Sequence, residues 1–191
     1  MKKQNPAIVY GLIGAAILIV FGLVAQMLIT SSLQKAVNSG NSVSPFKFLW
    51  VGILSLLVIV GVYLFCIIKS IKDYRKANAD YTYGKLVGHG LLATLILAIV
   101  STAFSLLYSQ VIDPGAMKKN IELTEKVFEN MSMPDDQKEK ALERIRNQDP
   151  VRQAVNSLAI TLVCGLIVSL ITASVLNKKG KEFPANPNNL S

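Results

Sequence analysis

Hydrophobic positions along the chain gather into four long runs that are separated by polar segments. Each run has at least 20 residues and contains no Asp, Glu, Lys or Arg. The four runs are Ala7–Ile29, Phe48–Ile68, Leu86–Tyr108 and Ala154–Leu176. About 20 helical residues, at about 1.5 Å each, cross the hydrocarbon core of a bilayer. Because lipid requires every backbone N–H and C=O to be bonded within the protein, each run is expected to be a transmembrane helix.

The order of the runs predicts one all-α integral membrane domain over residues 1–191. Its four transmembrane helices are expected to form a four-helix bundle that crosses the membrane up, down, up and down. The first run is longer than the apolar core of a signal peptide and has no small-x-small cleavage site after it, so we expect it to be retained. The segment Thr30–Lys47 is rich in Ser, Asn and Gly and is predicted to be a polar loop between the first two helices.

A charged segment, Asp113–Pro150, separates the third and fourth runs and has the pattern of two amphipathic helices. Asp113 is a typical N-cap residue, and Pro114 fits the first position of a helix. A second Asp-Pro pair, Asp149-Pro150, stands at the start of the fourth run. We therefore predict an extracytoplasmic helical hairpin over 113–150, between transmembrane helices 3 and 4.

Two interpretations of this hairpin remain open. In the first, it is a solvated connector whose apolar stripes pack on each other and on the rim of the bundle. In the second, the stripes form a docking surface for a partner protein. The residues of such a surface would be Met117, Ile121, Phe128, Met131, Leu142 and Ile145.

The distribution of charge predicts the orientation of the chain. Positive charge is dense in the segment 69–85, which carries five cations against two acids, and next to both termini. By the positive-inside rule, this density places both termini in the cytoplasm. The formal net charge of +8 lies mostly at the ends of apolar runs rather than along one face, so we expect contacts with anionic membrane lipids and none with nucleic acid.

Candidate chemistry is sparse. The absence of ionisable acids and bases from the four runs argues against a proton-coupled transporter or a charge-lined pore within one subunit. The single histidine, His89, has no acid or cysteine pattern around it that indicates catalysis or metal binding, so a structural role is expected. Cys66 and Cys164 lie at different depths of their spans, which disfavours a disulfide. We predict no catalytic, cofactor or metal residues, and no enzyme.

Small and hydroxylated residues indicate where helices approach each other. Residues at four-residue spacing that are expected to pack against a neighbouring helix are Gly11, Ala15, Gly84, Gly88, Gly165 and Ser169. The third run also carries Ser101, Thr102 and Ser105, and hydroxyls recur in the fourth run. These hydroxyls either hydrogen-bond between helices or line a polar cavity between spans three and four.

Three stretches of the sequence resemble a known family. They are the opening MKKQNPAIVYGLIGAAILI, the basic loop IKDYRKANADYTYGKLVGHG, and the VIDP that follows the third run. The chain resembles, over nearly its whole length, the bacterial membrane family known as domain of unknown function 4199. The resemblance implies a multipass protein of the bacterial inner membrane with no assigned activity, so no catalytic or binding residues can be transferred.

Two functions are consistent with these features. The first is a non-enzymatic accessory, scaffold or regulatory subunit that acts by contact with an unknown protein partner or by self-association. The alternative is a small transporter or channel component that works as an oligomer. The charge-free spans favour the first function, although neutral solutes can pass along a hydroxyl-lined path.

Overall fold

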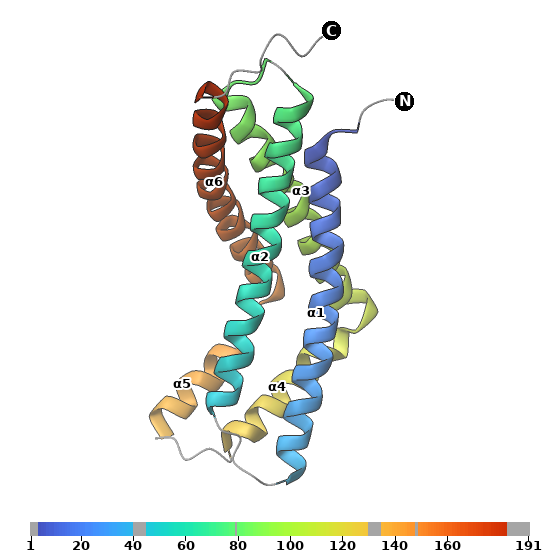
Figure 1. The fold of residues 1–191 in the computed structure, drawn as a ribbon. Coiled ribbons are helices and arrows are strands. Elements are labelled where there is room, and N and C mark those ends of the chain that lie inside the picture. The colour runs from blue at the N-terminus through green and yellow to red at the C-terminus, as the bar shows by residue number, and fades with distance from the viewer. Residues whose placement is uncertain (1–3, 40–44, 79, 130–134, 148, 183–191) are drawn as a thin grey trace. The chain divides into compact units, whose positions relative to one another are not determined.

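The structure, a computed structural model, describes residues 4–39, 45–78, 80–129, 135–147 and 149–182. These residues form helices and their connections, with no strand among them, which confirms the all-helical prediction. The elements are α1 (Pro6–Ser39), α2 (Pro45–Ala77), α3 (Tyr83–Leu107), the π-helix η1 (Tyr108–Ile112), α4 (Pro114–Glu129), α5 (Asp135–Arg146) and α6 (Pro150–Glu182) (Figure 1).

Four of the helical segments are long and apolar enough to cross a membrane, as predicted. They are Pro6–Asn38, Gly52–Ala77, Tyr83–Ile112 and Val151–Asn177. Only 11% to 28% of the residues in the most apolar part of each segment are buried within the chain. Most of their apolar side chains therefore face outward, as expected of helices that are solvated by lipid. The protein is thus a membrane protein with four candidate spans.

The prediction of a polar loop over Thr30–Lys47 is wrong for most of that segment. Helix α1 continues to Ser39, and α2 already begins at Pro45; residues 40–44 lie outside the described part. The helix persists because Leu33 and Ala36, three residues apart, share one face and are buried against α4. Packing of this apolar pair outweighs the polar composition around it.

Proline residues mark several of the helix starts. Asn5 and Asp149 each cap a helix through a side-chain oxygen, which accepts the N–H of Ala7 at 3.0 Å and of Val151 at 2.9 Å respectively. The cap precedes a proline at the first helical position in both cases, where the missing N–H costs no hydrogen bond. Helix α4 likewise begins at Pro114, directly after Asp113, so both predicted Asp-Pro helix starts are confirmed.

Replacing Asp149 by alanine is expected to loosen the first turn of α6. The lost cap costs about 1 kcal/mol, which corresponds to roughly fivefold faster hydrogen exchange at the amides of the first turn. Asp149→Asn is the matched control, because asparagine caps equally well without the charge. If the first-turn amides of α6 exchange at the same rate in Asp149→Ala and Asp149→Asn, the side-chain cap does not stabilise this turn.

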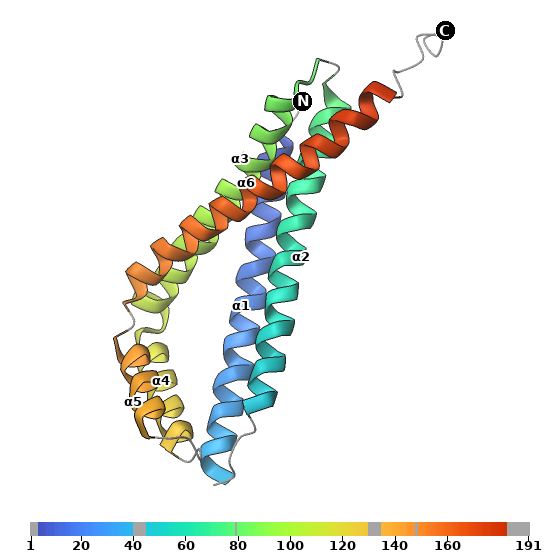
Figure 2. The same ribbon diagram turned by 90° about the vertical axis from the view of Figure 1, so that its left-hand side faces the viewer.

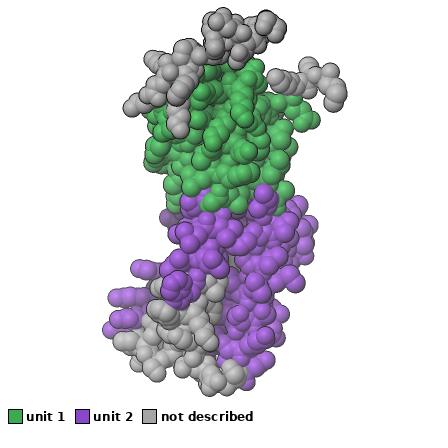
Figure 3. Space-filling model, in the orientation of Figure 1, with its two compact units in different colours: residues 1–16, 61–100, 158–191 green, residues 17–60, 101–157 purple. Residues whose placement is uncertain are grey.

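The chain divides into two compact units, which Figure 3 shows in different colours. Unit 1 comprises Met1–Ala16, Gly61–Val100 and Leu158–Ser191, and unit 2 comprises Ile17–Val60 and Ser101–Ser157. Helices α1, α2, α3 and α6 contribute residues to both units. The single membrane domain that the sequence predicts stays a prediction.

The core of unit 1 is formed by α2, α3 and α6, which are visible in Figure 2. Ile67 and Ile71 of α2 meet Leu86 of α3, and Ala173 and Leu176 of α6 complete the cluster. All five residues are buried. These contacts fix the segments around the basic stretch 69–85 that stands out in the sequence.

Polar side chains in that basic stretch bond to the helices around it. The Arg75 guanidinium donates to the carbonyl oxygen of Leu176 at 2.9 Å and lies 5.5 Å above the ring of Tyr81. The Tyr10 hydroxyl of α1 donates to the Asp73 carboxylate at 2.5 Å. Helices α1 and α6 are therefore each tied to the end of α2 by a charge-assisted hydrogen bond.

His89 belongs to the same unit. Its ring stacks on Tyr74 with centroids 3.5 Å apart, and its Nδ1 atom lies 3.1 Å from the carbonyl oxygen of Lys85. The Ser70 hydroxyl donates to the backbone carbonyl of His89 at 3.3 Å. These contacts give His89 a packing role between α2 and α3.

A close crossing of α3 and α6 in unit 1 is built from two glycines and two hydroxyl residues. A Cβ atom placed at Gly165 would collide with the side chain of Thr94, and one placed at Gly90 would lie 2.5 Å from Ser169 Oγ. The Thr94 hydroxyl donates to the Gly90 carbonyl at 3.0 Å, and the Ser169 hydroxyl to the Gly165 carbonyl at 2.7 Å. Each hydroxyl is thus satisfied within its own helix, while the opposite glycine makes room for it.

Unit 2 holds its own apolar cluster and the two short helices of the charged segment. Leu33 and Ala36 of α1 pack with Val127 of α4, and Val37 and Leu123 cover them. Helices α4 and α5 lie side by side (Figures 1 and 2) and are in contact. The extracytoplasmic location of this pair stays a prediction.

Candidate functional site

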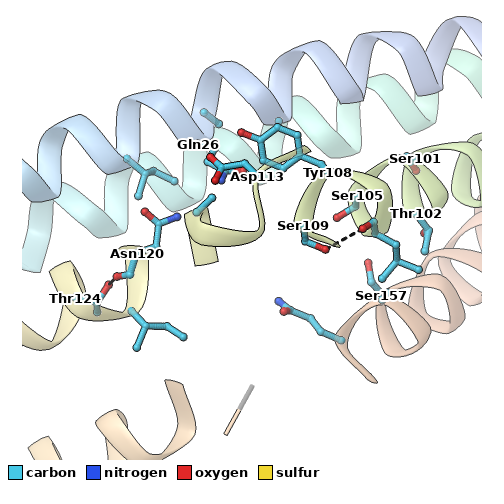
Figure 4. Close-up of a pocket in the computed structure, with 18 residues that line it drawn as sticks. Gln26, Ser101, Thr102, Ser105, Tyr108, Ser109, Asp113, Asn120, Thr124 and Ser157 are labelled. Atoms are coloured by element: carbon cyan, nitrogen blue, oxygen red, sulfur yellow. Dashed lines mark hydrogen bonds between the residues drawn. The ribbon is translucent and has the colours of Figure 1, made fainter. Parts of the chain in front are cut away.

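A cavity of about 710 Å³ lies within unit 2. Its volume is in the range typical of small-molecule sites. Residues of α1, the last turns of α3, η1, α4 and the first turns of α6 form its walls (Figure 4). The cavity therefore gathers side chains that are far apart in the sequence.

Many of the lining residues carry polar side chains, although apolar atoms contribute more of the wall surface. The neutral polar side chains are Gln26, Ser101, Thr102, Ser105, Tyr108, Ser109, Asn120, Thr124, Gln153 and Ser157. Asp113 is the one lining residue with a formal charge among those that the structure describes. Hydroxyls and amides both donate and accept hydrogen bonds, so the walls can hold a polar solute from several sides.

The π-helix η1 connects α3 to α4 at the cavity. The Asp113 N–H donates to the Tyr108 carbonyl at 2.8 Å, which closes the wider five-residue turn. Ser109 bonds back to the carbonyl of Leu106 at 3.1 Å. Single π turns of this kind are frequent at functional sites, because they change the direction of side chains at the end of a regular helix. Here Tyr108, Ser109 and Asp113 all become lining residues.

Hydrogen bonds hold the α4 wall of the cavity in place. The Thr30 hydroxyl of α1 donates to Asn120 Oδ1 at 2.8 Å. One turn later, the Thr124 hydroxyl donates to the Asn120 carbonyl at 2.6 Å. The extension of α1 beyond the predicted span is therefore what positions Asn120, and a polar loop over these residues would not supply this contact.

A second, smaller cavity of about 220 Å³ adjoins the first. The two cavities share the wall residues Gly22, Gln26, Ser101, Ser105 and Tyr108. The remaining walls of the smaller cavity are apolar and consist of Leu18, Ile19, Leu23 and Phe104. The smaller cavity thus adds four apolar wall residues to polar residues that it shares with the larger one.

The residues singled out in the sequence fall partly within this site. Ser101, Thr102 and Ser105, which were candidates for a polar cavity, line it, and so does Ser157 from the fourth span. The contributions of Gln26, Asp113, Asn120 and Gln153 are not evident from the sequence, because these residues come from segments that only the fold brings together. The one feature of the sequence that could point to these four residues is that each is polar and lies within or near an apolar run.

The predicted docking residues are dispersed. Ile121 lines the cavity, and Leu142 is half-buried on α5. Met131 lies outside the described residues, as do the side chains of Met117, Phe128 and Ile145. A docking role for this set stays a prediction.

The predicted packing residues differ from one another in their surroundings. Gly165 and Ser169 lie in the crossing of α3 and α6, and Gly11 is close to Ile96 and Ala93 of α3, with a built Cβ 2.9 Å from Ile96 Cβ. Ala15 is fully buried. A Cβ atom at Gly84 or Gly88 would meet no atom within 4 Å, so these two glycines face open space in the described chain.

The family of the chain follows from a comparison with family models. The model described as "Protein of unknown function (DUF4199)" matches residues 9–178. The chain belongs to this family. The matched residues include every residue that lines the two cavities of this DUF4199 protein. Comparisons with curated proteins and with solved structures gave no match. The family description assigns no activity.

Within the described part of the chain, no group of three or more His, Cys, Asp or Glu side chains is placed to hold a metal ion.

Proposed function

We propose that this DUF4199 protein binds a small polar solute in the large cavity of unit 2 and acts as a small transporter or channel component. The observation that carries the proposal is the polar lining, which gathers hydroxyl and amide side chains from three spans, η1 and α4. Ser109, Asn120 and Thr124 are hydrogen-bonded within the chain. Side chains such as those of Gln26 and Ser105 add donors and acceptors that can serve a polar occupant or water.

The depth of the lining residues supports this function. Ser101 precedes the end of the predicted span Leu86–Tyr108 by about two helical turns, or about 10 Å. Ser157 and Gln26 also lie inside predicted spans. Hydrogen-bonding groups at such depth are the means by which transporters and pores select solutes. The residues of one chain line the cavity, so the site itself needs no second copy.

The packing of α4 favours solute binding over partner docking. Val127 is only 6% exposed because it packs on Leu33 and Ala36 of α1. Leu123 joins the same cluster, and Ile121 faces the cavity. These three described apolar residues of α4 are therefore used inside unit 2, which leaves them less available to an accessory or scaffold partner.

Cysteine labelling tests whether the cavity is open to water. In a background with Cys66→Ala and Cys164→Ala, we expect Ser105→Cys and Ser157→Cys to react rapidly with a water-soluble, membrane-impermeant thiol reagent, because the reactive thiolate forms only in a hydrated site. Leu57→Cys is the matched control, since Leu57 is an exposed apolar residue of α2 (64% exposed) and is expected to face lipid.

The same labelling experiment can also contradict the proposed function. If Ser105→Cys and Ser157→Cys react as slowly as Leu57→Cys from either side of the membrane, the cavity is closed to water and the proposed function fails. If these variants label only when reagent is on the cytoplasmic side, the proposed solute site stands and the predicted orientation is wrong.

A further inference from the structure

We infer that the cavity selects a small organic cation that carries a short apolar group. The inference rests on the proposed function and names the class of solute. Three features of unit 2 support it: the charge of Asp113, the acceptors beside it, and the apolar wall residues of the adjoining cavity.

The charge of Asp113 indicates which sign of charge the bound solute carries. Asp113 is the one charged residue among the described lining residues of the large cavity. Asp113 is exposed, and its carboxylate forms no hydrogen bond or ion pair with another residue in the part of the chain that the structure covers. A carboxylate without a protein partner at a polar cavity favours a cationic occupant over an anionic one.

Helix ends at the cavity do not reverse this preference. The α3–η1 helix ends at the cavity with its negative pole, and α4 begins there with its positive pole. Each pole is equivalent to roughly half an elementary charge, and the two are of opposite sign. The positive pole of α6 is offset by Asp149, which accepts the N–H of Val151. Asp113 therefore supplies the one full charge among the described lining residues.

Neutral groups near Asp113 suit an ammonium group. Figure 4 draws Gln26, Tyr108 and Asp113 along the same side of the cavity. An ammonium group has three donors and no acceptor, and the amide oxygen of Gln26 and the hydroxyl of Tyr108 can accept two of them. The face of the Tyr108 ring also attracts a cation.

The smaller cavity defines the other end of the solute. Its volume of about 220 Å³ exceeds the roughly 150 Å³ of an engineered apolar cavity that binds benzene. Leu18, Leu23 and Phe104 are among its apolar walls, and Gln26 and Tyr108 line both cavities. A phenyl ring or short alkyl group in this cavity leaves its ammonium group on the side of Asp113.

Calorimetry on the full chain in nanodiscs of zwitterionic lipid tests this inference. The probes are 2-phenylethylammonium, its neutral analogue 2-phenylethanol, the anion phenylacetate, and methylammonium, with binding to empty nanodiscs subtracted. We expect saturable binding of 2-phenylethylammonium that is at least tenfold tighter than that of the other three. Asp113→Asn should abolish the advantage over 2-phenylethanol. Asparagine is itself a good N-cap, so the start of α4 is retained.

Glu122→Gln is the matched control, because Glu122 is an exposed acid of α4 that does not line the cavity. This variant should bind all four probes as tightly as the parent chain does. Equal binding of the ammonium and the alcohol, with no effect of Asp113→Asn, overturns the inference and leaves the solute site intact. Tighter binding of phenylacetate than of the ammonium overturns the inference, because it would mean that the positive N-terminal ends of the helices select an anion. Lack of saturable ammonium binding also overturns it, whereas slow labelling of both Ser105→Cys and Ser157→Cys removes the proposed function itself.

Discussion

Replacing Gly165 by leucine is expected to lower the free energy of unfolding of unit 1 by about 3 kcal/mol, the upper end of typical overpacking costs. Gly165 is buried against Thr94, and a single added Cβ atom already collides with the Thr94 side chain. Thr94 cannot turn away easily, because it is itself buried and bonded to the Gly90 carbonyl. Leucine would therefore push α3 and α6 apart at their crossing.

Gly88→Leu is the control for this prediction. Gly88 is exposed on α3, and a Cβ atom there meets nothing within 4 Å. The same glycine-to-leucine change should shift the free energy of unfolding by no more than about 0.5 kcal/mol. Denaturant unfolding in detergent micelles measures both variants. Equal destabilisation would mean that the α3–α6 crossing does not limit the stability of the unit.

Filling the cavity is expected to have the second large effect. Ser105 lines both cavities, so Ser105→Trp should occupy much of the space between them. We expect labelling of Ser157→Cys by the water-soluble thiol reagent to slow by at least tenfold, and saturable binding of 2-phenylethylammonium to be lost. Because the indole enters existing space, the unfolding free energy should change by less than about 1 kcal/mol.

Leu57→Trp provides the comparison for the cavity-filling variant. It adds a ring of the same size to an exposed apolar residue of α2 outside the cavities. Labelling of Ser157→Cys and binding of the probe should both stay at the parental level. If Ser105→Trp leaves labelling and binding unchanged, the two chambers are not the route by which reagent and solute reach Ser157.

The sequence predicts the spans well because hydrophobic length is a property of each segment alone. The runs free of charged residues become four membrane-length helices, and the Asp-Pro pairs at 113 and 149 mark helix starts. The extension of α1 to Ser39 is missed for the opposite reason. It depends on Leu33 and Ala36 meeting α4, and that contact belongs to the fold rather than to local composition.

Glycine spacing gives a second example in which local sequence does not predict which residues contact another helix. Gly84 and Gly88 stand four residues apart, as Gly90 and Thr94 do, yet only the second pair meets a neighbouring helix in the described chain. Spacing identifies residues that share a helix face, whereas the rotation of α3 decides which face is covered. For the site, the hydroxyls of the third run could be recognised as one polar face, but their meeting with Gln26 and Asn120 could not.

The crossing of α3 and α6 also bears on how the protein assembles during synthesis. The Thr94 and Ser169 hydroxyls are already bonded to carbonyls of their own helices. Each helix can therefore enter the bilayer as an independent segment without carrying either hydroxyl unsatisfied. The hydrogen bonds of these two hydroxyls therefore do not depend on contact between α3 and α6 while the rest of the chain is still being translated. The crossing can form last, by lateral association of two finished helices whose fit depends on shape.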